Sequence, residues 1–195
     1  MNSITHHPED ATLTAYAAGS LPAALALVVG CHLEHCPACR KKVAEGEAIG
    51  GALMADSAVQ PLSTEARASM LALLDEEPTI HPPSAPRAES TTQASDGANR
   101  HLPKKLQRLL GNTDLASRDW RKAGPGVRIL TLDCDEGNAI LLDIAPGHAV
   151  PVHSHRGTEL TLILDGDYDD ELGHFGSGDV ADLDSEVEHQ PKAGP

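Results

Sequence analysis

Apolar residues recur at helical spacing through the first 75 residues of the chain. An i, i+3, i+4 pattern that opens on acids or prolines predicts helices over residues 9–18, 23–35 and 37–56. Gly19 ends the first of these patterns in the manner of a helix C-terminal glycine. A fourth helix is predicted to follow a serine cap at residue 63. The N-terminal part is therefore predicted to be a small bundle of about four helices.

The apolar positions of the last two helices predict how they pack. On the third helix, four side chains are expected to face inward: Val43, Ile49, Leu53 and Met54. On the fourth helix, four more form an apolar stripe: Met70, Leu71, Leu73 and Leu74. A fourth helix usually packs on the other three. The alternative is that its stripe binds a partner as a helix in a groove.

The pattern changes to period two in the second half of the chain. After a short helical stretch at residues 104–110, apolar runs occupy residues 127–132, 139–144 and 159–164. Glycine- and aspartate-rich turns separate these runs. Several short strands at even spacing are typical of an all-β sandwich or barrel. The predicted fold is therefore an α + β protein of two domains, helical first and all-β second.

The stretch between the two patterns has the composition of a linker. Residues 77–100 are rich in Pro, Ser and Thr and show no apolar period. We therefore expect a helical domain at residues 1–76, a flexible linker at 77–100 and a β domain at 101–195.

Composition limits both the core and the partners. Aromatic residues make up only 2% of the chain, so the cores must be built from aliphatic side chains, and a bound metal becomes a plausible source of stability. The formal charge of −14 argues against direct binding to nucleic acid, which requires clustered Lys and Arg. A basic protein is the expected partner.

The sequence also suggests a compartment. It contains no run of about 20 apolar residues that could cross a bilayer, and its N-terminus lacks the basic and apolar regions of a signal peptide. The four cysteines include a metal-spaced pair, which suits a reducing environment. We expect a cytoplasmic protein without a membrane anchor.

A His-x3-Cys-x2-Cys cluster lies between the second and third predicted helices. The spacing of His32, Cys36 and Cys39 is that of one helical face, but a proline after Cys36 favours the first turn of a new helix. We therefore expect His32 in the last turn of one helix, Cys36 at the cap of the next and Cys39 inside it. Thiolates at a helix N-terminus are stabilised by its N–H groups and dipole. Such ligands in a tetrahedral set select Zn2+, so a fourth ligand is required. His6 and His7 are the nearest upstream candidates.

A second cluster of metal-ligand residues lies in the β half. His153 and His155 are two residues apart on a predicted strand, so both rings point to one face. Glu159 is expected on the next strand, and His189 on a strand that closes the other side. Three histidines and one carboxylate suit Zn2+, Mn2+, Fe2+ or Ni2+ without choosing among them.

Residues 1–76 resemble the zinc-binding anti-sigma domain, and the stretch from residue 6 to Gly19 resembles its ChrR branch in particular. The resemblance implies that this part sequesters a sigma factor of the extracytoplasmic-function type in a 1:1 complex. It also implies that the zinc ligands are His7, His32, Cys36 and Cys39.

The second cluster, with Gly147 before it and Gly166 after it, resembles the first cupin motif, and residues 178–191 resemble a looser second motif. This implies a cupin jelly roll whose metal ligands are His153, His155, Glu159 and His189. The chain ends six residues after His189, where that fold normally has a further strand. We therefore expect the barrel to be open there or cut short.

Two classes of function follow. One is a regulator, with no enzymatic activity, whose zinc helices hold a sigma factor until the cupin domain detects a signal. The ChrR resemblance implies that this signal is oxidative stress of the singlet-oxygen kind. The alternative is a metal-dependent cupin enzyme, a dioxygenase, isomerase or hydrolase, with a helical regulatory domain. Four protein ligands and an almost aromatic-free lining favour the sensor. Cys134 is either an inert core thiol or a redox-reactive one.

Overall fold

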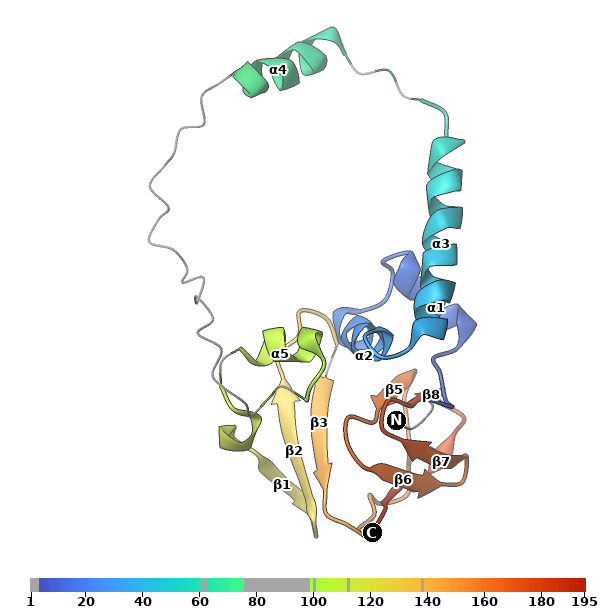
Figure 1. The fold of residues 1–195 in the computed structure, drawn as a ribbon, viewed down its shortest axis with the longest axis vertical. Coiled ribbons are helices and arrows are strands. Elements are labelled where there is room, and N and C mark those ends of the chain that lie inside the picture. Colours follow the sequence, from blue (N-terminus) through green and yellow to red (C-terminus); the bar gives the residue numbers. More distant parts are fainter. Residues whose placement is uncertain are drawn as a thin grey trace.

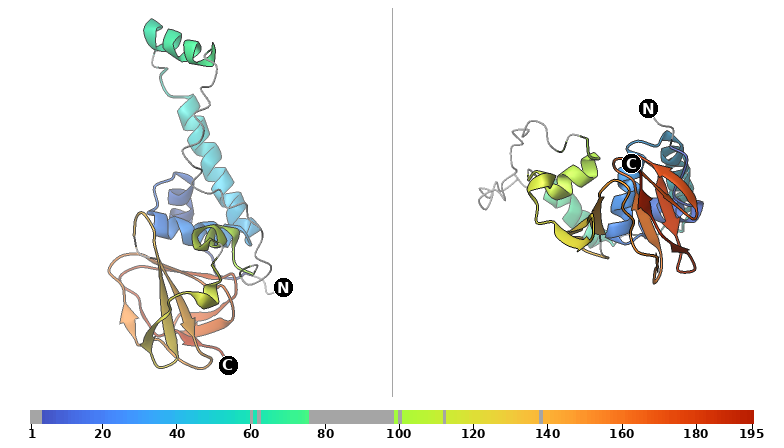
Figure 2. Two further views of the ribbon diagram at one scale, coloured as in Figure 1. Left: turned by 90° about the vertical axis from the view of Figure 1, so that its left-hand side faces the viewer. Right: turned by 90° about the horizontal axis from the view of Figure 1, so that it is seen from below.

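The computed structural model describes residues 4–59, 61, 63–75, 99, 101–111, 113–137 and 139–195. Apart from residue 99, the predicted linker at 77–100 lies outside the described residues. The five α-helices are α1 (Asp10–Ala17), α2 (Ala23–Leu33), α3 (Pro37–Ala55), α4 (Thr64–Asp75) and α5 (Lys104–Leu110). Their bounds agree with the predicted helices to within two residues at each end. Helices α1 and α2 lie against one end of the β half (Figures 1 and 2).

Helix α3 departs from its predicted packing. Val43 is buried as expected, but Ile49, Leu53 and Met54 are 63%, 68% and 77% exposed. Helix α1 covers only the first turns of α3, and the remaining turns project beyond the helical core (Figure 1). The expectation that these three side chains face inward is wrong, because α1 and α2 are too short to reach them.

Helix α4 does not pack on the other helices. Its cap is the predicted one, since Ser63 Oγ accepts a hydrogen bond from the N–H of Ala66 at 3.0 Å. Its apolar stripe is nevertheless exposed, with Met70, Leu71, Leu73 and Leu74 between 52% and 79% accessible. The expectation of a packed fourth helix is therefore wrong, since no other described element covers its apolar stripe.

The second half is built of short antiparallel strands. A three-stranded sheet joins β1 (Arg121–Gly124), β2 (Val127–Leu132) and β3 (Ala139–Ile144), after a 3-10 turn at Leu115–Ser117. The other strands are β4 (His153–Ser154), β5 (Glu159–Leu162), β6 (Asp167–Asp170), β7 (Gly173–Gly176), β8 (Val180–Leu183), β9 (Glu188–His189) and β10 (Lys192–Ala193). They pair as β4 with β9, β5 with β8, and β10-β6-β7. The all-β expectation for this half is confirmed.

The residues after His189 form a strand of their own. In β10, Lys192 and Ala193 pair with Asp169 and Tyr168 of β6, and Lys192 also bridges to Ala149. The tail therefore adds a third strand to the β6–β7 hairpin instead of leaving its edge bare.

The helical and β halves share their hydrophobic cores. In one cluster, Ala24 and Cys31 of α2 are buried with Leu106 of α5 and Leu130 of β2. In the other, apolar side chains of the first three helices are buried with Leu160 of β5 and Val180 of β8. Removing either half would expose apolar surface on the other, so the two halves stabilise each other.

Polar contacts join the halves at the edge of these clusters. The Glu34 carboxylate, at the end of α2, accepts hydrogen bonds from the N–H groups of Lys104 and Lys105 at 2.7 and 2.9 Å. It thus satisfies two free donors at the start of α5. The N–H of Ala24, at the start of α2, donates to the carbonyl of Glu136. In the described ranges, no helix is both long and apolar enough to cross a membrane.

Candidate metal centres

The structure brings His7, His32, Cys36 and Cys39 together, with one ligand atom of each within 4.8 Å of the others. His7 precedes α1, and His32 lies in the last turn of α2. Cys36 is the N-cap of α3, followed by proline at the first helical position, and Cys39 is in the first turn. The Cys36 Sγ accepts a hydrogen bond from the Cys39 N–H at 3.4 Å, as expected for a thiolate held at a helix N-terminus.

The spacing of these atoms fits a zinc ion. His7 Nδ1 lies 3.4 Å from the Sγ atoms of both cysteines, and His32 Nε2 lies 3.3 Å from Cys39 Sγ. In a tetrahedral site with Zn–S bonds of about 2.3 Å and Zn–N bonds of about 2.0–2.1 Å, a sulfur and a nitrogen are about 3.6 Å apart. The observed separations are close to that edge length, so the four side chains are already arranged to hold the ion.

Burial of this cluster opposes charge on its members. The pKa of Cys39 is raised to about 12, mainly by burial and also by the hydrogen bond and charge of Cys36. Burial also lowers the pKa of His32, which favours the neutral ring that binds metals. A cation in the cluster would displace the thiol protons, because the thiolate is the metal-binding form.

His6 lies outside the cluster. Its backbone N–H donates to Asp179 Oδ1 at 2.9 Å, and its ring stacks on Phe175 with centroids 4.2 Å apart. The chain therefore directs His6 toward the β half and His7 toward the cysteines. The sequence left this choice open, because neighbouring residues in an extended segment point in opposite directions and either could face the site.

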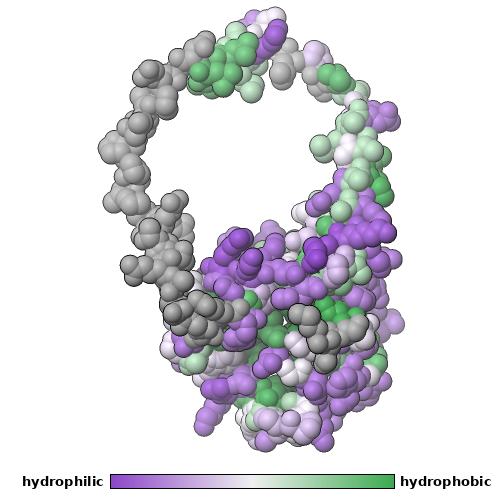
Figure 3. Space-filling view, viewed as in Figure 1, coloured by the Kyte–Doolittle hydropathy of each residue, from purple (hydrophilic) through white to green (hydrophobic). Residues whose placement is uncertain are grey.

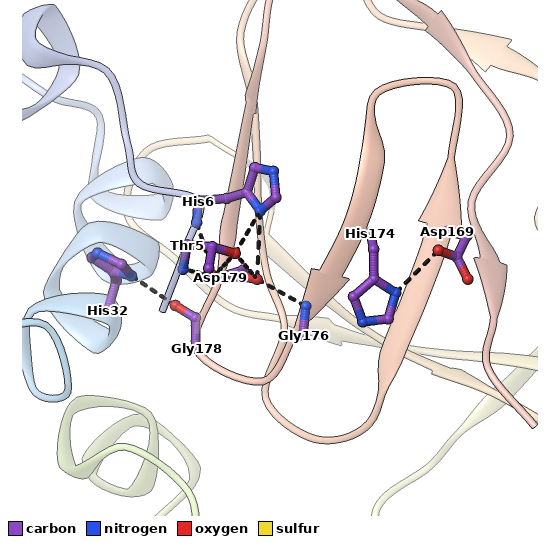
Figure 4. Close-up of polar contacts among 8 residues, drawn as sticks. All are labelled: Thr5, His6, His32, Asp169, His174, Gly176, Gly178 and Asp179. Carbon is purple, nitrogen blue, oxygen red and sulfur yellow. Dashed lines mark hydrogen bonds and ion pairs between the residues drawn. The ribbon is translucent and has the colours of Figure 1, made fainter. Parts of the chain in front are cut away.

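Two residues in contact with this region were not predicted. The Gly178 carbonyl accepts a hydrogen bond from His32 Nδ1 at 2.9 Å (Figure 4). A carbonyl can only accept, so Nδ1 carries the proton and Nε2 is left for a metal. Asp179, next in the chain, binds the segment just before His7. The only sequence signal was a glycine–aspartate turn, which shows nothing of its partner about 170 residues away.

His153, His155, Glu159 and His189 form the second cluster, also within 4.8 Å of one another. His153 and His189 face each other in the β4–β9 pair, and their ring centroids are 4.7 Å apart. The Nε2 atoms of His155 and His189 are 3.2 Å apart, and Glu159 Oε2 lies 2.8 Å from His155 Nδ1. The predicted strands therefore do converge on one point.

Outer contacts orient two of these rings. His153 Nδ1 donates to the Pro151 carbonyl at 2.8 Å, and His189 Nδ1 contacts Asp170 Oδ2 at 2.9 Å. The side chains of His189 and Asp170 are 1% and 0% exposed. A carboxylate bound to Nδ1 of a histidine leaves Nε2 free for a metal and increases its basicity. Asp170 was missed because it lies in an acidic run that resembles a solvated hairpin.

Comparisons with known proteins identify both halves of the chain. Residues 10–40 match a family described as a putative zinc-finger, and residues 110–195 match the ChrR Cupin-like domain. The anti-sigma-E factor ChrR of Cereibacter sphaeroides is 42% identical over 192 residues, which are 98% of this chain and 84% of the relative.

The fold has a match among solved structures. A chain in the crystal structure of Rhodobacter sphaeroides SigE in complex with the anti-sigma ChrR is 40% identical, with a TM-score of 0.79, and the match covers 98% of this chain and 94% of that one. Both halves and their order are thus shared with ChrR. The chain belongs to the ChrR family of anti-sigma factors, which are regulators and not enzymes.

Proposed function

We propose that this protein sequesters a sigma factor of the extracytoplasmic-function type in a 1:1 cytoplasmic complex and releases it on oxidative stress of the singlet-oxygen kind. The observation that supports this most is the match over 98% of the chain to a protein solved in complex with SigE. The helical domain at residues 1–76 would hold the sigma factor, and the cupin domain at 101–195 would respond to the signal.

The exposed helices supply a surface for such a partner. Seven large apolar side chains on α3 and α4 are at least 52% exposed: Ile49, Leu53, Met54, Met70, Leu71, Leu73 and Leu74. Figure 3 shows hydrophobic residues gathered on α4 and on the outer part of α3. Single exposed leucines are common, but seven on two successive helices indicate a protein-binding surface.

The charge of the chain suits the same partner. At −14 the protein attracts a basic surface, and sigma factors need basic surfaces to bind DNA. Electrostatic attraction would speed the encounter, while the apolar side chains of α3 and α4 would slow dissociation. Both contributions act in the same complex and can be separated by their dependence on salt.

Zinc in the first cluster would join the segment before α1, the end of α2 and the start of α3, the helix that carries part of this surface. His7, His32, Cys36 and Cys39 would be its four ligands, so every position would be filled by protein, as in structural sites. The Cys36 cap and the Cys39 turn would then fix the start of α3 relative to α2. The ion would supply stability and no chemistry, since no position is open to substrate.

A second metal would sit between His153, His155, Glu159 and His189. Bound there, a divalent transition metal would supply a centre that responds to oxidants, and the ring orientations set by Asp170 and Pro151 fit its binding. His155 and Glu159 side chains are 14% and 33% exposed, so a small oxidant can reach this side of the cluster.

The test is to isolate the tagged chain from its own cells and identify what is bound to it by mass spectrometry. The expected result is one sigma factor at equal stoichiometry. The double variant Leu71→Ala/Leu74→Ala should weaken its binding by about tenfold or more, because buried apolar anchors supply most of the binding energy. The control is Leu109→Ala on α5, where the leucine is also exposed but lies off this surface. Recovery of the chain without any sigma factor would contradict the proposal.

A further inference from the structure

We propose that the turn between β7 and β8 of the cupin domain is a positioning element for the N-terminal zinc site, with Asp179 and Gly178 holding the segments that carry His7 and His32. This inference rests on the zinc site proposed above. It makes the affinity for zinc depend on how the cupin domain is docked.

Asp179 accepts hydrogen bonds from the chain just before His7. It is 3% exposed, and its Oδ1 accepts hydrogen bonds from the N–H groups of Thr5 at 2.7 Å and His6 at 2.9 Å (Figure 4). Its Oδ2 accepts from the Thr5 hydroxyl at 3.2 Å and from the Gly176 N–H at 2.9 Å. Hydrogen bonds to a buried carboxylate are stronger than those between neutral groups, so this contact restrains residues 5 and 6.

Gly178 contacts the other histidine. Its carbonyl accepts from His32 Nδ1 at 2.9 Å, which fixes the ring with Nε2 toward Cys39. Gly178 has φ of +94°, and a Cβ there would lie 2.9 Å from Ile4 Cγ1. The turn therefore requires glycine both for its backbone conformation and for the close approach of the N-terminal segment.

Strand β8, which follows this turn, binds the chain on the C-terminal side of His7. Asp182 of β8 accepts hydrogen bonds at Oδ2 from the Glu9 N–H at 2.9 Å and from the Thr12 hydroxyl at 2.7 Å. In addition, the Val180 N–H donates to the His6 carbonyl at 3.2 Å. His7 is thus bracketed by contacts to residues 179–182 of the cupin domain.

His7 needs this restraint more than the other ligands do. His32, Cys36 and Cys39 belong to α2 and α3 or to the cap between them, whereas His7 precedes α1 in an extended segment. Without the cupin contacts, the segment around residues 4–6 would have to be ordered by the metal itself. Ordering these residues costs conformational entropy, which would appear as weaker zinc binding.

Linkage makes the effect reciprocal. If docking of the β7–β8 turn raises the affinity for zinc by some factor, then zinc raises the affinity of docking by the same factor. A change in the cupin domain that shifts this turn would therefore loosen the zinc site, and a change at the zinc site would loosen the cupin domain. In the cupin domain, the residues that connect it to the zinc site are 176–182.

The experiment measures zinc affinity of the full-length chain by competition with a chromogenic chelator, in wild type, Asp179→Ala and Thr5→Pro. Thr5→Pro removes both the N–H and the hydroxyl that Thr5 donates to Asp179, without altering the cupin core. Both variants should bind zinc about 10- to 100-fold more weakly, the usual effect of losing an outer contact to a metal ligand. After substitution with Co2+, the thiolate-to-metal charge-transfer absorption reports on this site alone, because it is the one candidate metal cluster of the described residues that includes cysteines.

Asp169→Asn is the matched control. Asp169 is an exposed carboxylate of the β6–β7 hairpin in the same domain, and its Oδ1 lies 3.0 Å from His174 Nδ1 (Figure 4). Its variant should keep the zinc affinity and the Co2+–thiolate absorption of wild type. If the two test variants fold and bind zinc as wild type does, the β7–β8 turn has no positioning role. If wild type itself shows no Co2+–thiolate absorption, the zinc site is refuted instead, so the two failures can be told apart.

Discussion

Replacing Leu106 by alanine tests whether the helical and β halves unfold as one unit. Leu106 of α5 is 3% exposed and is buried with Ala24 and Cys31 of α2 and with Leu130 of β2. Removing a buried leucine side chain costs about 2–5 kcal/mol, because it loses transfer free energy and leaves a cavity. The side chain lies in a core shared by both halves, so both should lose this stability together.

The expected shift is large enough to measure. For a chain of this size, 1 kcal/mol corresponds to about 2–4 °C, so Leu106→Ala should lower Tm by roughly 4–20 °C. Leu109→Ala on the same helix is the control, since Leu109 is 42% exposed. Burial of the rest of that side chain contributes only about 1–1.5 kcal/mol. The two variants share a helix and a substitution and differ in burial.

Two probes separate the halves during thermal or urea unfolding. Far-UV circular dichroism at the helical band reports mainly on α1 to α4, and the fluorescence of Trp120, the chain's single tryptophan, reports on the β half, where it packs against the shared cluster. Leu106→Ala should shift both transitions by the same amount. A shift in the fluorescence transition alone, or equal shifts in the two leucine variants, would refute the shared core.

Three further predictions concern the metal clusters and the contact between the halves. Cys39→Ser should abolish zinc binding at the first cluster and most helical circular dichroism, since a structural zinc contributes on the order of 10 kcal/mol to folding. Cys134→Ser should keep both, and a Cys39→Ser protein that folds without zinc in the first cluster would disprove this prediction. His153→Ala should leave repression of a sigma-dependent reporter intact and abolish its induction by a photosensitised oxidant, so normal induction would argue against sensing at this cluster. Burial opposes ionisation of Asp179, but hydrogen bonds from three backbone N–H groups outweigh burial and lower the pKa of this carboxyl. The ionised Asp179 therefore stabilises the fold fully above about pH 4, where an unfolded aspartate is also ionised. This stabilisation is lost as the pH falls through the lowered pKa of the folded state. The difference in urea midpoint between wild type and Asp179→Asn should accordingly narrow below about pH 4, and a difference that stays constant down to about pH 3 would contradict this.

Local patterns in the sequence were sufficient for the secondary structure and for most members of the two candidate ligand clusters. The structure has the predicted arrangement from His32 to Cys39, with Cys36 as the cap of α3 and a proline directly after it. These features depend only on residues that are close in sequence. The β2 and β3 strands and α5 match their predicted bounds, because period and turn residues specify short elements directly. The expectation that His189 lies on a strand that closes the second cluster is met by its pairing with His153.

Only the tertiary structure decided which surfaces are covered. The same apolar periodicity predicted burial for Val43 and for Leu53, but Val43 is buried and Leu53 is 68% exposed, because α1 ends before it can reach Leu53. Periodicity shows that a helix has an apolar face and says nothing about what covers it. In α4 that face has no cover within the described part of the chain.

Contacts between distant segments were also beyond the sequence. The shared cores, the choice between His6 and His7, and the contacts of Gly178 and Asp179 with the zinc cluster join residues up to 174 positions apart. No local pattern encodes such a pair, since it depends on how two complete domains dock. The sequence by itself determined which residues are candidate metal ligands, and the tertiary structure decided that His7 faces the two cysteines while His6 contacts Asp179 of the cupin half.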